Sequence, residues 1–289
     1  MARIVYVNGR YLPYAEAQIH CEDRGFLFGD AVYEVFPVIG GRIIDEEPHL
    51  ARLERSMAEL AMQPPMSRAS LGVVLRETVR RNRVVDGSVY LQVSRGAAPR
   101  DFLFPPADTP RTVVAFARSQ EFDAAEALAQ KGIAVISAPD QRWGRVDIKT
   151  VNLLAPVLAK ERAKAANAKE CWQTDRDGFV TEGASSNAWI ITGDGEIRTR
   201  KADHAILRGV TRTVLMAFLD REKLRITERP FTIAEAKSAA EAFVTSATTF
   251  VLPVVMIDGA KIGGGKPGAI ALKLRQLVVG AATAKPLAD

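Results

Sequence analysis

This chain of 289 residues has no long apolar run, no cysteine motif and no basic block. It has no stretch of about 18 uncharged apolar residues, so we expect no membrane-spanning helix. The first residues, MARIVYVNGRYLPY, lack the apolar core of a signal peptide and predict a strand followed by an Asn8-Gly9 turn. The two cysteines, Cys21 and Cys171, form neither a metal motif nor a disulfide framework. We therefore expect a cytoplasmic protein without a metal site.

The charge pattern argues against a nucleic-acid-binding surface. The net charge is +5 and the pI is about 9.3, but Lys and Arg are interleaved with Asp and Glu, as in AKERAKAANAKE. A basic block with aromatic residues between its charges, which is typical of nucleic-acid binding, does not occur. A solvated surface explains the charges better. The mild positive bias would also suit small anionic ligands.

The succession of patterns predicts an α+β fold with two domains, one at 1–120 and a larger one at 121–289. Apolar residues make up 47% of the chain, enough for a sizeable core. Alternating and helical periodicities in the first domain predict hairpins at 3–12 and 30–44, helices at 46–62 and 68–84, and strands at 87–96 and 111–118. The polar run 119–130 is interpreted as a linker. In the second domain we expect a strand at 132–139 and helices at 152–167, with Asn152 as its cap, and at 209–223.

A lysine stands within a segment that otherwise favours a strand. Lys149 lies in the run Val146-Asp-Ile-Lys-Thr-Val151, where alternate residues share a face. Taken alone, it is best explained as the solvent-facing side of an edge strand. A lysine held among apolar groups has instead a lowered pKa and a nucleophilic amine, which suits a Schiff base.

Two later motifs offer contacts for a ligand. Glu182, in FVTEGASSNAWII, follows a strand and precedes small residues that let the backbone approach a ligand. In ILRGVTRTVL, Gly209 precedes a helix that opens with Val210 and Thr211, and free N–H groups at a helix start favour a phosphate. Each motif alone is explained as well by a solvated turn or an ordinary helix start.

An arginine in the first domain is placed to reach the buried side of its helix. On the helix at 46–62, Arg52 flanks the apolar stripe of Leu50, Leu53 and Met57. Arg55 lies nearly opposite that stripe and is predicted to be a surface charge.

In their order and spacing, these pieces resemble the fold-type IV family of pyridoxal-phosphate enzymes. The resemblance runs from EDRGFLFGDAVYEVF through RWGRVDIKTVNLL, VTEGASSN and LRGVTR to FVTSATT, and so covers nearly the whole chain. The runs DRGFLFGDAVYEV and QVSRGAAPR are most similar to the D-amino-acid transaminases. The resemblance implies two α/β domains with pyridoxal 5'-phosphate at their interface.

The resemblance also implies a role for each matching residue. Lys149 would form the internal aldimine with the cofactor, and Glu182 would pair with the pyridine nitrogen and keep it protonated. The other cofactor contacts would come from Arg52, Leu207, Val210, Thr211, Ser246 and Ala247. The substrate would be bound by Tyr33, Arg100 and Phe102.

The implied activity moves an amino group from a D-amino acid to a 2-oxo acid in a ping-pong cycle. The freed amine of Lys149 would carry a proton between the substrate carbon and the cofactor. Three other reactions of the family stay open, in this order: (R)-amine:pyruvate transamination, branched-chain L-amino-acid transamination, and aminodeoxychorismate lyase chemistry. The family also implies a homodimer, in which the loop RGAAPRD would let Arg100 serve the neighbouring subunit.

Three positions depart from the family pattern. Phe102 stands where D-amino-acid transaminases usually carry a histidine, and it cannot donate a hydrogen bond to a substrate carboxylate. An apolar side chain there would better tolerate a bulky or carboxylate-free substrate, such as an (R)-amine. Ala247 and Ala184 replace hydroxyl residues, and each change removes one donor, worth about 0.5–1.5 kcal/mol.

Overall fold

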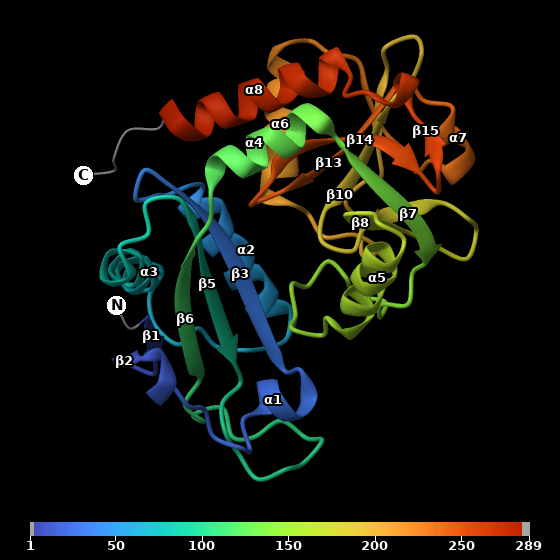
Figure 1. Ribbon diagram of the computed structural model, residues 1–289. Helices are drawn as coiled ribbons and strands as arrows, with labels where there is room; N and C mark the ends of the chain where they lie inside the picture. The colour runs from blue at the N-terminus through green and yellow to red at the C-terminus, as the bar shows by residue number, and fades with distance from the viewer. Residues whose placement is uncertain (1–2, 285–289) are drawn as a thin grey trace. The chain divides into compact units, whose positions relative to one another are not determined.

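The computed structural model describes residues 3–284, which form two compact units (Figure 1). The first unit comprises the chain up to Glu121 together with Ile148–Asn152, and the second comprises Phe122–Asp147 and the chain from Leu153 onward. Each unit combines a sheet with helices, which confirms the predicted α+β fold. Within the described range, no helix is long and apolar enough to cross a membrane.

The first unit is built on a six-stranded antiparallel sheet with the order β2-β1-β6-β5-β3-β4. Its elements are β1 (Ile4–Val7), β2 (Arg10–Pro13), η1 (Tyr14–Glu16), α1 (Arg24–Phe28), β3 (Ala31–Ile39), β4 (Arg42–Ile43), α2 (Glu46–Glu59), α3 (Arg68–Asn82), β5 (Gly87–Ser94) and β6 (Thr112–Ser119). Helices α2 and α3 pack on the sheet, and their apolar side chains form one core with those of β3, β5 and β6.

Local sequence explains the hairpins and the orientation of α2. Asn8 and Gly9 both have positive φ, 47° and 88°, as the tight hairpin turn between β1 and β2 requires. The predicted stripe of α2 is buried, and the two arginines beside it differ as expected. The side chain of Arg52 is 10% exposed and that of Arg55 is 43% exposed. The prediction that Arg52 reaches the buried side is confirmed.

The second unit contains a nine-stranded mixed sheet. Its main path has the order β12-β11-β10-β13-β14-β7-β8-β9, and β15 pairs with β14. Its elements are α4 (Phe122–Lys131), β7 (Ile133–Pro139), α5 (Leu154–Ala165), β8 (Glu170–Thr174), β9 (Val180–Gly183), β10 (Asn187–Ile191), β11 (Ile197–Thr199), α6 (Val210–Arg221), β12 (Ile226–Glu228), α7 (Ile233–Lys237), β13 (Glu241–Ser246), β14 (Phe250–Ile257), β15 (Ala260–Lys261), η2 (Gly263–Gly265) and α8 (Ala269–Ala284). Helices α4 and α8 both contact β14, which lies inside the sheet.

Two local predictions in the second unit are wrong. The run 119–130 is not a linker, because most of it forms α4, in which Ala129 is completely buried and Leu128 packs against the core. Alanine, leucine and glutamate favour a helix, and this propensity outweighs the polar composition. Helix α5 starts after Leu153, so Asn152 is not its cap. The amide of Asn152 donates instead to the hydroxyl of Thr150, over 3.3 Å.

The segment around Lys149 also differs from its prediction. Residues 146–151 form turns and a single bridge between Thr150 and Val32, not a strand. The N–H of Tyr33 donates to the carbonyl of Lys149 over 3.0 Å, and the N–H of Val151 donates to the carbonyl of Ala31 over 3.1 Å. These bonds tie Ile148–Asn152 to β3 of the first unit, whereas the sequence boundary had assigned Lys149 to the second domain.

Candidate functional site

The side chain of Lys149 lies on an aromatic surface of the first unit. Its Nζ is 4.3 Å from the centroid of the Tyr33 ring, within the range of a cation–π contact. The Tyr33 ring stacks on that of Tyr90 at 5.5 Å, and Tyr90 stacks on Phe116 at 4.8 Å. The amine is therefore held against a ring at a half-buried position, not extended into water from an edge strand. Tyr33, predicted from the resemblance as a substrate residue, lies beside the predicted Schiff-base lysine.

Helix α2 supports this segment of the first unit. The N–H of Lys149 donates to the hydroxyl of Ser56 over 3.3 Å, and Ser56 is completely buried. One turn earlier on the same helix, Arg52 binds the carboxylate of Glu34, a buried residue of β3. The predicted site residues of the first unit thus lie on three elements that are bonded to one another: Tyr33 on β3, Arg52 on α2 and Lys149 on the segment Ile148–Asn152. The proposed phosphate contact of Arg52 remains a prediction.

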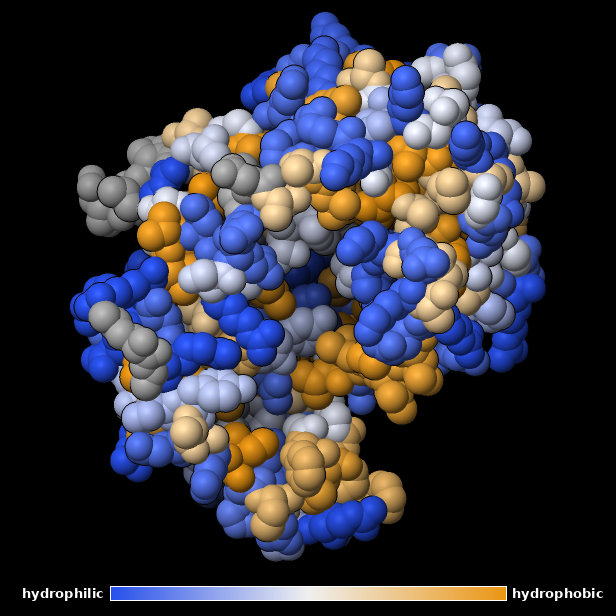
Figure 2. Space-filling view, in the orientation of Figure 1, coloured by the Kyte–Doolittle hydropathy of each residue, from blue (hydrophilic) through white to orange (hydrophobic). Residues whose placement is uncertain are grey.

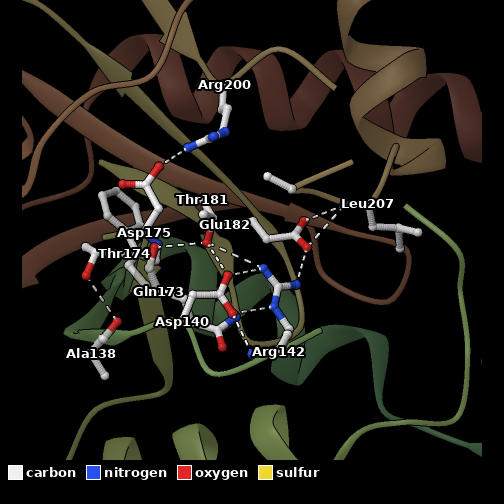
Figure 3. A network of polar contacts seen from close by, with 12 residues as sticks. Ala138, Asp140, Arg142, Gln173, Thr174, Asp175, Thr181, Glu182, Arg200 and Leu207 are labelled. Carbon is white, nitrogen blue, oxygen red and sulfur yellow. Dashed lines mark hydrogen bonds and ion pairs between the residues drawn. The ribbon is translucent and has the colours of Figure 1, made fainter. Parts of the chain in front are cut away.

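In the second unit, Glu182 lies near the end of β9 inside a dense polar network (Figure 3). Arg142 donates from Nη1 to Glu182 Oε1 over 2.5 Å, and Asn187 donates from Nδ2 to Oε2 over 2.8 Å. The N–H of Leu207 lies 3.2 Å from both carboxylate oxygens. Three donors from three separate segments therefore fix the position and plane of this carboxylate, which is only 4% exposed.

Arg142 and Asp140 decide the electrostatics of this network. Arg142 donates to Asp140 through Nε over 3.0 Å and through Nη2 over 2.7 Å, so one guanidinium joins two carboxylates. Burial by itself would lower the pKa of Arg142, but Glu182 and Asp140 raise it above its usual value. Burial raises the pKa of Glu182, and the cation of Arg142 opposes that rise. The arginine therefore stabilises the ionised form of a carboxylate that burial would otherwise neutralise.

The sequence motifs do not point to Arg142 or Asp140 as site residues. The only signal for Arg142 was its place in RWGRVDIKTVNLL, the same run that contains Lys149. Arg142 and Glu182 are 40 residues apart, so their ion pair has no local pattern. Asn187 lies in the run VTEGASSN, and its bond to Glu182 is seen only in the structure.

Asn187 connects the carboxylate with the start of helix α6. Its Nδ2 also donates to the carbonyl of Leu207 over 2.9 Å, and its Oδ1 packs against Gly209. A Cβ added at Gly209 would lie 2.2 Å from that oxygen, so only glycine fits there without displacing Asn187. Glu182, Leu207 and the first residues of α6 are therefore neighbours, as the resemblance implied.

The start of α6 has the features of an anion site. Gly209 is the N-cap residue and, among the described residues, no side chain caps it. The N–H groups of Val210 and Thr211 belong to the first turn, where the helix itself supplies no acceptors. Both residues are buried, and the twelve-residue helix adds a positive partial charge at this end.

Ser246 lies at the same end of the sheet. Thr245, the residue before it on β13, pairs with Asn187 on β10. The hydroxyl of Ser246 is 2.7 Å from that of Thr249 and accepts a bond from the N–H of Thr249 over 3.3 Å. The turn that contains Ala247 thus has a second hydroxyl, on Thr249, although residue 247 itself has none.

Arg100 and Phe102 lie on an exposed loop of the first unit between β5 and β6. The guanidinium of Arg100 is 5.5 Å from the Phe28 ring and 5.6 Å from the Phe102 ring. Phe102 is 80% exposed, and Leu103, Phe104 and the nearby Phe26 are exposed as well. Figure 2 shows hydrophobic residues on the surface at the lower end of this unit, where α1 and the loop lie in Figure 1.

Two buried arginines hold this loop from the inside. Arg24 and Arg95 both donate to Asp30, over 2.9 and 2.7 Å, and Arg24 also binds the carbonyls of Asp101 and Leu103. The base of the loop is therefore fixed, while its apolar tip faces outward. In the described residues, the ring contacts of Arg100 are with Phe28 and Phe102, whereas Tyr33 is in contact with Lys149.

Comparisons with known proteins identify the family of this chain. A family model described as amino-transferase class IV matches residues 31–257, more than half of the chain. The D-alanine aminotransferase of Staphylococcus epidermidis is 37% identical over 272 residues, covering 94% of this chain and 95% of the relative. That of Bacillus licheniformis is 39% identical over 264 residues, covering 91% and 92%.

Solved structures show the same fold. A branched-chain amino acid aminotransferase from T.th., complexed with N-(5'-phosphopyridoxyl)-L-glutamate, has a TM-score of 0.89 at 26% identity and covers 99% of this chain and 96% of its own. The Escherichia coli branched-chain enzyme, at 20% identity and a TM-score of 0.85 over 98% and 95% of the two chains, shows the fold alone. The chain belongs to the class IV aminotransferases, which confirms the predicted fold-type IV family.

Proposed function

We propose that this protein is a pyridoxal-phosphate-dependent transaminase that moves an amino group from a D-amino acid to a 2-oxo acid. The observation that carries the proposal is the placement of Glu182, a buried carboxylate joined through Asn187 to the start of α6. The curated relatives support the D-amino-acid class, because several D-alanine aminotransferases are 35–39% identical over nearly the whole chain. The branched-chain enzymes share the fold at lower identity, 20–26%.

The donor set of the second unit fits a phosphorylated pyridine. A carboxylate held in place by donors from Arg142, Asn187 and Leu207 suits a protonated ring nitrogen. The N–H groups of Val210 and Thr211, together with the hydroxyl of Ser246, suit a phosphate dianion. Leu207 would pack against the ring, since its N–H binds Glu182 and so places the residue beside the carboxylate.

The first unit supplies the reactive amine. When bound, pyridoxal phosphate would supply an aldehyde that holds the amino group and a ring that accepts electrons. Lys149 Nζ would bind the aldehyde between turnovers and would move a proton at the substrate carbon during them. The face of the Tyr33 ring, 4.3 Å from Nζ, would favour the protonated amine after it has taken that proton. Arg52 would add a bidentate contact to the phosphate.

Substrate choice is assigned to the exposed loop. Arg100 is proposed to bind the substrate carboxylate, and Phe102 offers an apolar surface where a second donor would otherwise stand. This surface favours (R)-amine:pyruvate transamination as the second candidate activity. Branched-chain L-transamination and the lyase reaction follow it in order.

A homodimer is part of the proposal. The exposed apolar side chains of Phe26, Phe102, Leu103 and Phe104 would be costly to leave in water as a group, and a second copy of the chain would cover them. Sedimentation velocity would test this, and a purely monomeric enzyme at micromolar concentration would contradict it. The cytoplasmic location expected from the scarcity of cysteine stays a prediction.

Borohydride trapping tests the cofactor assignment. We expect the purified protein to absorb visible light, and reduction with borohydride should attach the cofactor covalently to the peptide that contains Lys149. Lys149→Ala should abolish the attachment, whereas Lys201→Ala, a change of an exposed lysine, should not. Covalent trapping that persists in Lys149→Ala would refute the assignment.

A substrate panel tests the reaction. D-amino acids, L-amino acids and (R)-amines should each be assayed with pyruvate and with 2-oxoglutarate. We expect D-alanine or another D-amino acid to give the highest kcat/KM and to produce a 2-oxo acid with a matching aminated co-product. Pyruvate formed without an amino acceptor would show the lyase reaction instead.

A further inference from the structure

Strand β3 carries a charged residue on the side that faces the core. Val32, Glu34 and Phe36 alternate along the strand on one face, and all three are 0% exposed. A buried carboxylate is costly unless it is paired and hydrogen-bonded, so Glu34 needs a specific reason to be there. The proposed reaction does not use it directly.

Helix α2 supplies the partners of Glu34. Arg52 donates from Nε to Oε1 and from Nη2 to Oε2, both over 2.7 Å, which is the parallel two-bond geometry of a guanidinium and a carboxylate. His49, one turn earlier on the same face, lies with Nδ1 2.7 Å from Oε2. Because the ionised carboxylate can only accept, Nδ1 of a neutral His49 donates this bond. Three bonds of equal length therefore hold Glu34 in a closed cluster.

The protonation states agree with this geometry. Burial alone would raise the pKa of Glu34, but Arg52 and His49 outweigh it and bring the pKa to about 2. Burial lowers the pKa of His49, so its ring is neutral near neutral pH. The charges of the cluster are thus one carboxylate and one guanidinium.

We propose that Glu34 is a positioning residue that orients Arg52 toward the cofactor phosphate, an inference that rests on the proposed function. A guanidinium has five N–H donors in one plane. The bonds to Glu34 hold one edge of that plane, so the orientation of the whole group is set before a ligand arrives. A long side chain that is already ordered loses less conformational entropy on binding. The expected gain is selectivity for the phosphate-bearing cofactor.

The test separates position from charge. Glu34→Asp keeps the negative charge but shortens the side chain by one methylene, so the carboxylate no longer reaches both nitrogens at hydrogen-bonding distance. The apoenzyme is titrated with pyridoxal 5'-phosphate and with pyridoxal, which lacks the phosphate, and the two dissociation constants are compared. We expect the preference for the phosphorylated form to fall about tenfold, the size of one misaligned charge-assisted hydrogen bond. The affinity for pyridoxal should stay within about twofold of wild type.

Helix α2, which carries Arg52, also offers a matched control. Glu54 binds Arg68 through the same two-atom geometry, but its side chain is 35% exposed. Glu54→Asp should leave the preference unchanged. Arg52→Lys should lower it, because lysine cannot form the bidentate contact.

The outcomes separate this inference from the proposed function. A wild-type protein that binds neither ligand would refute the proposed function itself. Wild-type preference for the phosphate with an unchanged ratio in Glu34→Asp would refute only the positioning role. An unchanged ratio in Arg52→Lys would refute the phosphate contact of Arg52, and the positioning role with it. Equal losses for both ligands would mean that Glu34 serves the fold alone, which also overturns the inference. If Glu34→Asp does not fold, His49→Gln removes the Nδ1 donor without changing the charge, and the same ratio decides.

Discussion

Replacing Arg142 by methionine is expected to destabilise the second unit strongly. The arginine side chain is 7% exposed and makes three bonds to two largely buried carboxylates, Asp140 and Glu182. Methionine fills similar space but leaves both carboxylates without their cation. Breaking a buried ion pair from one side costs about 3–5 kcal/mol. Because Asp140 keeps the hydroxyl of Thr181 and Glu182 keeps two donors, we expect the lower end, about 3 kcal/mol.

The loss should depend on pH. The bonds from Arg142 hold the pKa of Asp140 below its usual value against the effect of burial, so in wild type this group stabilises the fold above its unfolded pKa and loses that effect as the pH falls. Burial raises the pKa of Glu182, so its ionisation weakens the fold as the pH rises. Without Arg142 the pKa values of both Asp140 and Glu182 rise, since Arg142 lowers each of them. The deficit of Arg142→Met is therefore largest at neutral pH and shrinks toward about pH 4.5.

Urea unfolding followed by tryptophan fluorescence measures this deficit. All three tryptophans, Trp143, Trp172 and Trp189, belong to the second unit, so the signal reports the part of the chain that contains Arg142. The control is Arg225→Met, which breaks an exposed ion pair with Asp194 in the same unit and should leave the unfolding free energy nearly unchanged. A deficit below about 1 kcal/mol at pH 7, or one that is equal at both pH values, would refute the reasoning.

Two further substitutions test the site. Gly209→Ala should lower the free energy of unfolding by about 1–3 kcal/mol and weaken retention of the cofactor, because the new Cβ displaces Asn187. Thermal melts and cofactor titration measure the two effects. Gly193→Ala is the control, since a Cβ at Gly193 meets open space. Phe102→His should raise kcat/KM for D-glutamate or D-alanine relative to (R)-1-phenylethylamine, because the new imidazole can donate a hydrogen bond to a substrate carboxylate. An unchanged ratio of the two kcat/KM values would remove Phe102 from substrate choice, and Leu103→His controls for a new imidazole on the loop.

Patterns that act over a few residues were read correctly from the sequence. The apolar stripe of α2 placed Arg52 toward the core and Arg55 toward water, since both follow from the helical repeat. The Asn8-Gly9 turn and its hairpin followed from the need for positive φ. In the run 119–130, polar composition and helix propensity point to different structures. Most of the run forms helix α4, because its residues favour a helix more strongly than a loop.

The conformation of the run around Lys149 does not follow from its local sequence. Its β-branched residues favour a strand, but the segment pairs with β3 only at Thr150 and otherwise turns. Strand propensity has its effect through pairing with neighbours, and those neighbours are determined by the fold. The motif predicts Lys149 as the reactive amine, whereas its place over the Tyr33 ring appears only in the structure.

By itself, the sequence determined the α+β class and the family, because ordered motifs carry that information along the chain, and it predicts Lys149 and Glu182 as site residues. Only the tertiary structure decided which groups control them. Arg142 forms an ion pair with Glu182, which is 40 residues away in the sequence, and Arg52 of helix α2 forms one with Glu34 of strand β3. A buried charge needs a partner in space, and folding can bring that partner from any distance in sequence, so no spacing pattern marks it.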